Sequence, residues 1–115
     1  MLGISLRELG DAIVVDCSGR IVYGDEAAAL RHQVKHLLGQ YPGVVLNLGD
    51  VTYIDSSGLG TLVGLWASAH NSGIELKLAG VHPRVADVLK ITRLATLFPM
   101  FDRAEDAAAT IKKAA

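Results

Sequence analysis

The hydrophobic pattern of this chain changes repeatedly between a period of two residues and a period of about 3.6. Apolar residues alternate with polar ones in Ile74–Leu78, whereas those of residues 27–38 recur at helical spacing. Strands separated by helices of crossover length imply a largely parallel sheet with helices packed against it. The chain is therefore predicted to have an α/β fold.

This pattern, read along the whole chain, predicts the element order ββαβαβαβα. Predicted strands are centred on residues 4–6, 13–17, 44–48, 74–78 and 97–101, and predicted helices cover residues 25–38, 56–72, 83–89 and 102–111. The first two strands form an antiparallel hairpin. The third is almost entirely apolar, which indicates a central strand covered on both faces. We expect a mixed, mostly parallel sheet with about four packed helices, in a single domain over residues 1–115.

Some local features carry more specific expectations. Residues 17–21 are predicted as a turn before the first helix, and residues 51–54 as part of the connection to the second. Glu75 and Lys77 are expected on a partly solvent-exposed strand face. Asp102 is expected to begin the last helix, because Glu105 follows it at capping-box spacing. The alanines of that helix are expected to face the core.

Charge and composition exclude several classes of function. Eleven basic and twelve acidic side chains nearly balance, and one Trp, three Tyr and two Phe are the only aromatic residues. Neither a basic surface nor a base-stacking platform is therefore expected, so nucleic-acid binding is not predicted. The single cysteine, Cys17, cannot form an internal disulfide, and no secretory signal begins the sequence. The longest uncharged stretch, Ser56–Ile74, has polar residues at both ends. We expect a cytoplasmic location without direct membrane insertion.

The most informative segment is Asp55-Ser56-Ser57-Gly58-Leu59-Gly60, at the start of the second predicted helix. In one interpretation Asp55 caps the helix, the serines fill its first turn and the glycines allow close packing. In another, a serine hydroxyl accepts a phosphate, whose charge would lie at the positive end of the helix. Spacing alone leaves both open.

With its apolar strand and the Val-x-Tyr-Ile lead-in, this segment resembles the signature of bacterial anti-sigma-factor antagonists of the STAS (sulfate transporter and anti-sigma-factor antagonist) family. The resemblance extends over the whole chain, including the Cys17–Ile21 segment and the terminal Ala-rich helix. In that family the serine directly after the aspartate is phosphorylated by the anti-sigma factor, which is itself a serine kinase. The resemblance thus implies Ser56 as the main phosphorylation site, with Ser57 a minor one.

The same resemblance implies how such a protein would work. Asp55, Ser56, Ser57, Gly58 and Leu59 would form the partner-binding surface. The unphosphorylated chain would bind the anti-sigma factor and free a sigma factor for transcription, and a cognate phosphatase would restore this form. The chain would be no enzyme and would need neither metal nor cofactor. The alternatives are a scaffold subunit of a signalling assembly and the cytoplasmic STAS component of a lipid or anion transport system.

Other candidate sites are less favoured by the sequence. The glycines from Gly58 to Gly64 depart from dinucleotide-binding spacing, and the serines lack a Gly-x-Ser-x-Gly nucleophile elbow. His32 and His36 lie one helical turn apart, but among basic residues on the polar face, so a solvated stripe is favoured over a metal site. Cys17 is predicted to be a buried apolar residue.

Overall fold

The computed structural model describes residues 2–112. In chain order the elements are β1 (Leu2–Leu9), β2 (Ala12–Ile21), α1 (Asp25–Leu38), β3 (Gly43–Ile54), α2 (Ser56–Ser72), β4 (Glu75–Ala79), α3 (Pro83–Ile91), the 3₁₀ helix η1 (Leu94–Thr96), β5 (Met100–Phe101) and α4 (Ala104–Ala109). The predicted fold class and element order are confirmed, with η1 as an addition. Residues 113–115, at the end of the predicted single domain, lie outside the described part.

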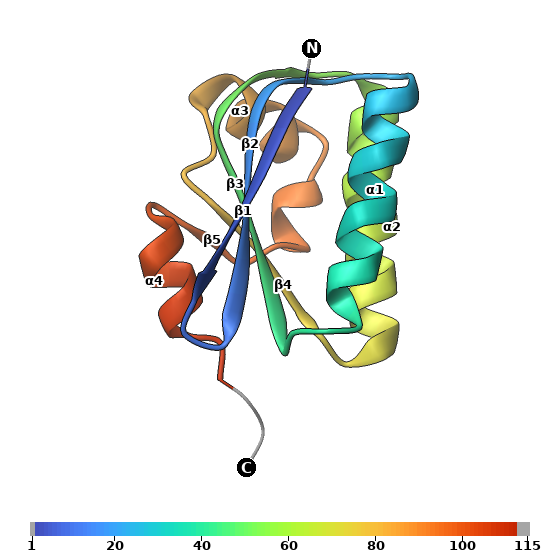
Figure 1. The fold of residues 1–115 in the computed structure, drawn as a ribbon. Coiled ribbons are helices and arrows are strands. Elements are labelled where there is room, and N and C mark those ends of the chain that lie inside the picture. Colours follow the sequence, from blue (N-terminus) through green and yellow to red (C-terminus); the bar gives the residue numbers. More distant parts are fainter. Residues whose placement is uncertain (1, 113–115) are drawn as a thin grey trace.

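The five strands form one sheet in the order β1-β2-β3-β4-β5. β1 runs antiparallel to β2, and the remaining neighbours are parallel. Helices α1 and α2 lie side by side on one face of this sheet, and α4 lies on the other (Figure 1). Because β2 and β3 are parallel neighbours, the ends that lead into α1 and α2 lie next to each other. The segment from Asp55 to Gly60, called the motif below, begins directly after the end of β3.

The position of β3 in the centre follows from its apolar sequence. Val44, Val45 and Leu46 are completely buried. Val44 and Leu46 pack into the larger core with α1, α2 and α3, whereas Val45 packs with α4. The prediction of a central strand covered on both faces is therefore confirmed.

The opposite face of the sheet is covered by small side chains of α4 and the residues after it. Ala104, Ala107, Ala108 and Ile111 are buried there, as the sequence predicted. The prediction of a partly solvent-exposed strand face is confirmed for Glu75, which is exposed, but was wrong for Lys77, because α4 covers it. The Lys77 side chain is 9% exposed and pairs with Glu75 at 3.1 Å. Its ammonium also donates to the Thr110 hydroxyl, so this buried charge is compensated.

Strands β2 and β3 both extend further than predicted. Residues 17–21 are not a turn, because β2 stays paired with β3 as far as Ile21 opposite Ile54. Irregularities in the register on either side of Ser18 and Gly19 allow this pairing to continue, and Gly19 has a φ of 100°. Residues 51–54 likewise belong to β3. The Ser18-Gly19 pair, which the sequence analysis predicted to be part of a turn, forms an irregularity within the strand.

The C-terminal region also departs from the prediction in two places. The predicted strand at residues 97–101 is reduced to the two residues of β5, at the edge of the sheet. Helix α4 begins at Ala104 with Arg103 as its N-cap, and no side chain caps it. The capping role expected of Asp102 was therefore wrong, because the helix starts one residue too late for it.

Candidate functional site

A single residue, Asp55, connects β3 to α2. Its backbone is extended, with φ −100° and ψ −176°, and its Oδ1 accepts a hydrogen bond from the Gly58 N–H at 2.8 Å. This carboxylate therefore satisfies one of the N–H groups that have no partner within the helix. The sequence prediction that Asp55 is the N-cap of this helix is confirmed.

The second oxygen of Asp55 binds a segment that the sequence did not connect with the motif. Oδ2 accepts from the Tyr23 N–H at 3.0 Å, and the Asp55 N–H donates to the carbonyl of Ile21 at 3.3 Å. The Tyr23 and Gly58 N–H groups together hold the pKa of the Asp55 carboxyl below its ordinary value. Asp55 thus connects the loop between β2 and α1 to the start of α2.

Gly58 allows the first turn of α2 to approach the end of β2. It is buried, and a Cβ added at this position would meet the carbonyl oxygen of Ile21 and the side chain of Ile54. Because the first obstacle is backbone, it cannot move aside as a flexible side chain could. The requirement for glycine here is therefore one of space.

The two serines of the motif have different environments. Ser56 is exposed, and its hydroxyl makes no hydrogen bond with another described residue. Ser57 is half-buried, and its carbonyl accepts a hydrogen bond from the Thr61 hydroxyl at 3.0 Å. Leu59, the last predicted contact residue, is half-buried against the main core. Of the two serines of the motif, Ser56 is therefore the more exposed.

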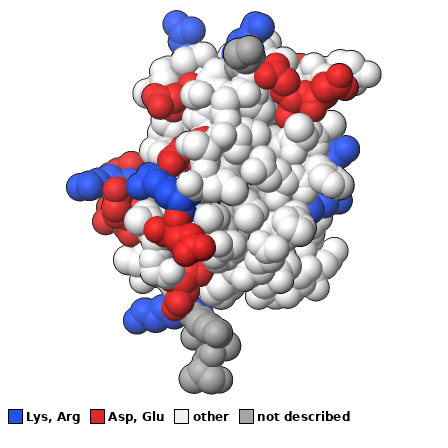
Figure 2. All heavy atoms as spheres, in the orientation of Figure 1, with Lys and Arg blue, Asp and Glu red and all other residues white. Residues whose placement is uncertain are grey.

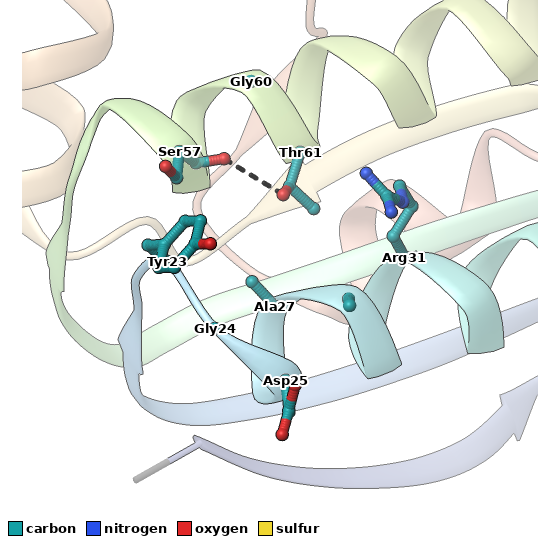
Figure 3. A pocket seen from close by; sticks show the side chains of 9 residues that line it. Tyr23, Gly24, Asp25, Ala27, Arg31, Ser57, Gly60 and Thr61 are labelled. Carbon is teal, nitrogen blue, oxygen red and sulfur yellow. Dashed lines mark hydrogen bonds between the residues drawn. The ribbon is translucent and has the colours of Figure 1, made fainter.

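An open cleft of about 540 Å³ lies between the N-terminal halves of α1 and α2. Figure 3 shows Ser57 and Thr61 of α2 on one side and Ala27 and Arg31 of α1 on the other, with Tyr23 at one end. Sequence reasoning missed Tyr23, Arg31 and Thr61 as neighbours of the motif. Helical spacing could have placed Thr61 one turn after Ser57. No local signal could have found Tyr23 and Arg31, because the fold brings them to α2 from a distant part of the chain.

The histidines and the cysteine that the sequence analysis considered as other sites lie outside the motif, on α1 and β2. His32 and His36 are exposed on α1. Among residues 2–112, no group of three or more His, Cys, Asp or Glu side chains is placed to hold a metal ion. Cys17 is buried as predicted, and burial raises the pKa of its thiol to about 12. Over the same described range, no helix has the length and apolar character needed to cross a membrane.

Comparison with known proteins gives a consistent result. The model of the STAS domain family matches residues 3–107. The chain is 30% identical to the anti-sigma-B factor antagonist of Bacillus subtilis over 105 residues, which cover 90% of this chain and 94% of the relative. The family model and this relative both extend over most of the chain.

Solved structures agree in fold. An anti-sigma factor antagonist from Mycobacterium paratuberculosis superposes with a TM-score of 0.78 at 20% identity, over 98% of this chain and 96% of the other. The anti-sigma factor antagonist SpoIIAA in its unphosphorylated form also gives a TM-score of 0.78, at 18% identity, over 96% of this chain and all of the other. SpoIIAA has been solved in its phosphorylated form as well, with a TM-score of 0.75 at 17% identity and the same coverage.

Proposed function

The chain belongs to the STAS domain family, and from this premise we propose that it is an anti-sigma factor antagonist controlled by phosphorylation of Ser56. In the unphosphorylated form it binds an anti-sigma factor and thereby frees a sigma factor for transcription. Phosphorylation ends that binding. The partner is both anti-sigma factor and serine kinase, a cognate phosphatase reverses the modification, and the exchange takes place in the cytoplasm.

The observation that carries this proposal is the accessibility of Ser56 on a rigid support. Its hydroxyl is exposed and bonded to no other described residue, whereas the backbone on either side is fixed by the Asp55 carboxylate and the paired end of β3. A kinase can reach such a hydroxyl without unfolding the domain. The added negative charge would meet solvent and the N-terminal end of a 17-residue helix, which favours anions.

Ser57 fits the role of a minor site. It is half-buried in the cleft between α1 and α2, so a kinase active site reaches it less easily than Ser56. The surface proposed for partner binding comprises Asp55, Ser56, Ser57, Gly58 and Leu59. Within it, Asp55 and Gly58 set the position of the serines through the contacts described above.

Release of the partner follows from the cost of desolvation. In the free domain, a phosphate on Ser56 stays hydrated. In an interface formed around Asp55 and Ser56, the same phosphate would lose water beside an existing carboxylate, which typically costs several kcal/mol per uncompensated ion. This unfavourable contribution exceeds the small gain at the helix end, about 0.3–1 kcal/mol. The chain itself performs no catalysis in this scheme, since ATP is bound by the kinase.

The test is incubation of the purified chain with ATP and the anti-sigma factor kinase of the same organism, followed by site-resolved mass spectrometry. We expect phosphate chiefly on Ser56, loss of most incorporation in Ser56→Ala, and little change in Ser57→Ala. Phosphate mainly on Ser57, or on neither serine, contradicts the proposal. The scaffold and transport alternatives do not require modification of Ser56, so the same assay separates them from the proposed function.

A further inference from the structure

We propose that the cleft between α1 and α2 is a second part of the partner-binding surface and receives a segment of the anti-sigma factor with an acidic side chain. This inference rests on the proposed function and extends it beyond the motif. The cleft lies next to the proposed phosphorylation site, since Ser57 is one of its lining residues (Figure 3). A partner that contacts Ser56 therefore reaches the cleft without a separate docking event.

The shape of the cleft suits a protein segment. Small residues make up much of its lining, among them Gly24, Ala27 and Ala28 of the α1 side and Gly60 of α2. A Cβ added at Gly60 would find no atom within 4 Å. The cleft, at about 540 Å³, has room for a side chain supplied by another molecule.

Tyr23, at one end of the cleft, has an exposed side chain on a fixed backbone. The residue is 84% exposed, although its N–H is bonded to Asp55. The following residue, Gly24, has a φ of 136°, a conformation that residues with side chains rarely adopt. The ring is therefore presented to solvent from a defined loop, which lowers the entropy lost when a partner packs against it. Tyrosine is also among the residue types enriched in interface hot spots.

Arg31, on the other side, determines the charge of the expected segment. It is exposed and makes no ion pair with any residue between 2 and 112, unlike Arg7, which pairs with Asp16 at 2.7 Å. No acidic residue occurs from residue 27 to residue 49, and His32 and Lys35 neighbour Arg31 on α1. Asp25 also lines the cleft, but its side chain is turned away from the space between the helices in Figure 3. A carboxylate of the partner would complement the guanidinium.

The two open glycines of α2 provide a sharp test. Gly60→Leu adds a large side chain at a residue that lines the cleft, whereas Gly64→Leu adds the same side chain one turn further along the helix, at a position whose Cβ also has no atom within 4 Å and which does not line the cleft. Leucine has a higher helix propensity than glycine, and thermal melts of both variants serve as the control for the fold. Any difference in binding between them then reflects the cleft and not the stability of the fold.

Binding is measured by calorimetry, with each unphosphorylated variant titrated against the purified anti-sigma factor of the same organism. We expect Gly60→Leu and Arg31→Glu to bind at least about tenfold more weakly than wild type, and Gly64→Leu to bind within about twofold. The Arg31→Glu defect should shrink as salt is added, because it is electrostatic. Tyr23→Ala should also weaken binding, whereas Ile91→Ala, which removes an equally exposed apolar side chain outside the cleft, should not.

The outcomes separate the two proposals. If wild type and Gly60→Leu bind with equal affinity, the cleft does not contact the partner, while the proposed function stands. Equal losses in Gly60→Leu and Gly64→Leu also contradict the cleft as the site of contact. A wild-type chain that binds no anti-sigma factor contradicts both proposals. An Arg31→Glu variant that binds as wild type does overturns the acidic chemistry assigned to the segment.

Discussion

Helices α1 and α2 lie side by side, but their N-terminal ends are constructed differently. Helix α1 follows Gly24, has no side-chain cap, and carries Asp25 and Glu26 in its first turn. Helix α2 follows Asp55, whose carboxylate caps it, and has no acidic residue in its first turn. Figure 2 shows acidic side chains gathered over the start of α1, in the upper right of the view. The positive end of the α1 dipole is therefore complemented by acidic residues in its first turn. The positive end of the α2 dipole is complemented by Asp55, the residue before its first turn.

This difference shows how a helix end can be stabilised and still accept a further charge. Both carboxylate oxygens of Asp55 are engaged with backbone N–H groups, of Tyr23 and Gly58. In α1, by contrast, Glu26 already uses its carboxylate to accept the Leu2 N–H at 2.6 Å. The first turn of α2 offers two hydroxyls where α1 has two acids. This difference supports our proposal that phosphorylation takes place at the start of α2.

The largest effect is expected from Gly58→Ala, which tests whether α2 begins in contact with β2. The new Cβ would overlap the carbonyl oxygen of Ile21, so α2 or β2 would have to move. We expect the free energy of unfolding, measured by urea denaturation, to fall by about 3 kcal/mol. Gly60→Ala is the matched control: its Cβ has open space, and a gain of about 0.5–1 kcal/mol is expected. Equal stabilities of the two variants would show that the contact with β2 is not required.

Asp55→Ala tests the cap that distinguishes the two helices. Both backbone N–H groups lose their acceptor, and the midpoint of thermal unfolding should fall by about 5 °C. At the start of α1, Glu26→Gln keeps an oxygen that can accept the Leu2 N–H, so a change of about 2 °C or less is expected. If the two changes are of similar size, the helix ends do not differ as described.

The pH dependence of stability tests the same carboxylate. The pKa of Asp55 is lowered in the folded protein, so its contribution is complete above the unfolded-state pKa, about 3.9. That contribution is lost as pH falls through the lower folded-state pKa. The pKa of Asp16 is also lowered, mainly by its hydrogen bond with Arg7, so Asp16 likewise stabilises the folded protein less as the pH falls. Asp55→Asn should therefore reduce, without abolishing, the loss of stability below about pH 4 in urea titrations. An unchanged acid slope would exclude Asp55 as a contributor.

Ser56→Ala should have the smallest effect. The hydroxyl is exposed and bonded to no other described residue, so the unfolding free energy should change by no more than about 0.5 kcal/mol. Chemical denaturation at neutral pH measures this. A loss above about 2 kcal/mol would give the hydroxyl a structural role and remove the main support for its role as a phosphate acceptor.

The sequence predicted the fold and the cap well because these depend on local pattern. Helical spacing placed the five buried residues of α1 correctly, namely Ala27, Leu30, Val34, Leu37 and Leu38. Asp55 is recognisable as an N-cap because the capping group lies three residues before its donor, Gly58. The serines of the motif could be placed at the helix start for the same reason.

The contacts between elements distant in the chain could not be predicted in this way. The bond from the Tyr23 N–H to Asp55 spans 32 residues and exists because β2 and β3 are paired as far as Ile21 and Ile54. The sequence also gave no sign that α4 would bury Lys77, since the alternation of residues 74–78 does not reveal what covers each face. The partners of a site thus depend on register and layer packing.

The most direct test of the account compares the unmodified chain with the chain phosphorylated on Ser56, each titrated into the anti-sigma factor by calorimetry. Circular dichroism melts of the two forms serve as the control for the fold. We expect nearly equal melting curves and an affinity at least about a hundredfold lower for the phosphorylated form, as follows from a desolvation cost of about 3 kcal/mol. Equal or tighter binding of the phosphorylated form would contradict the account.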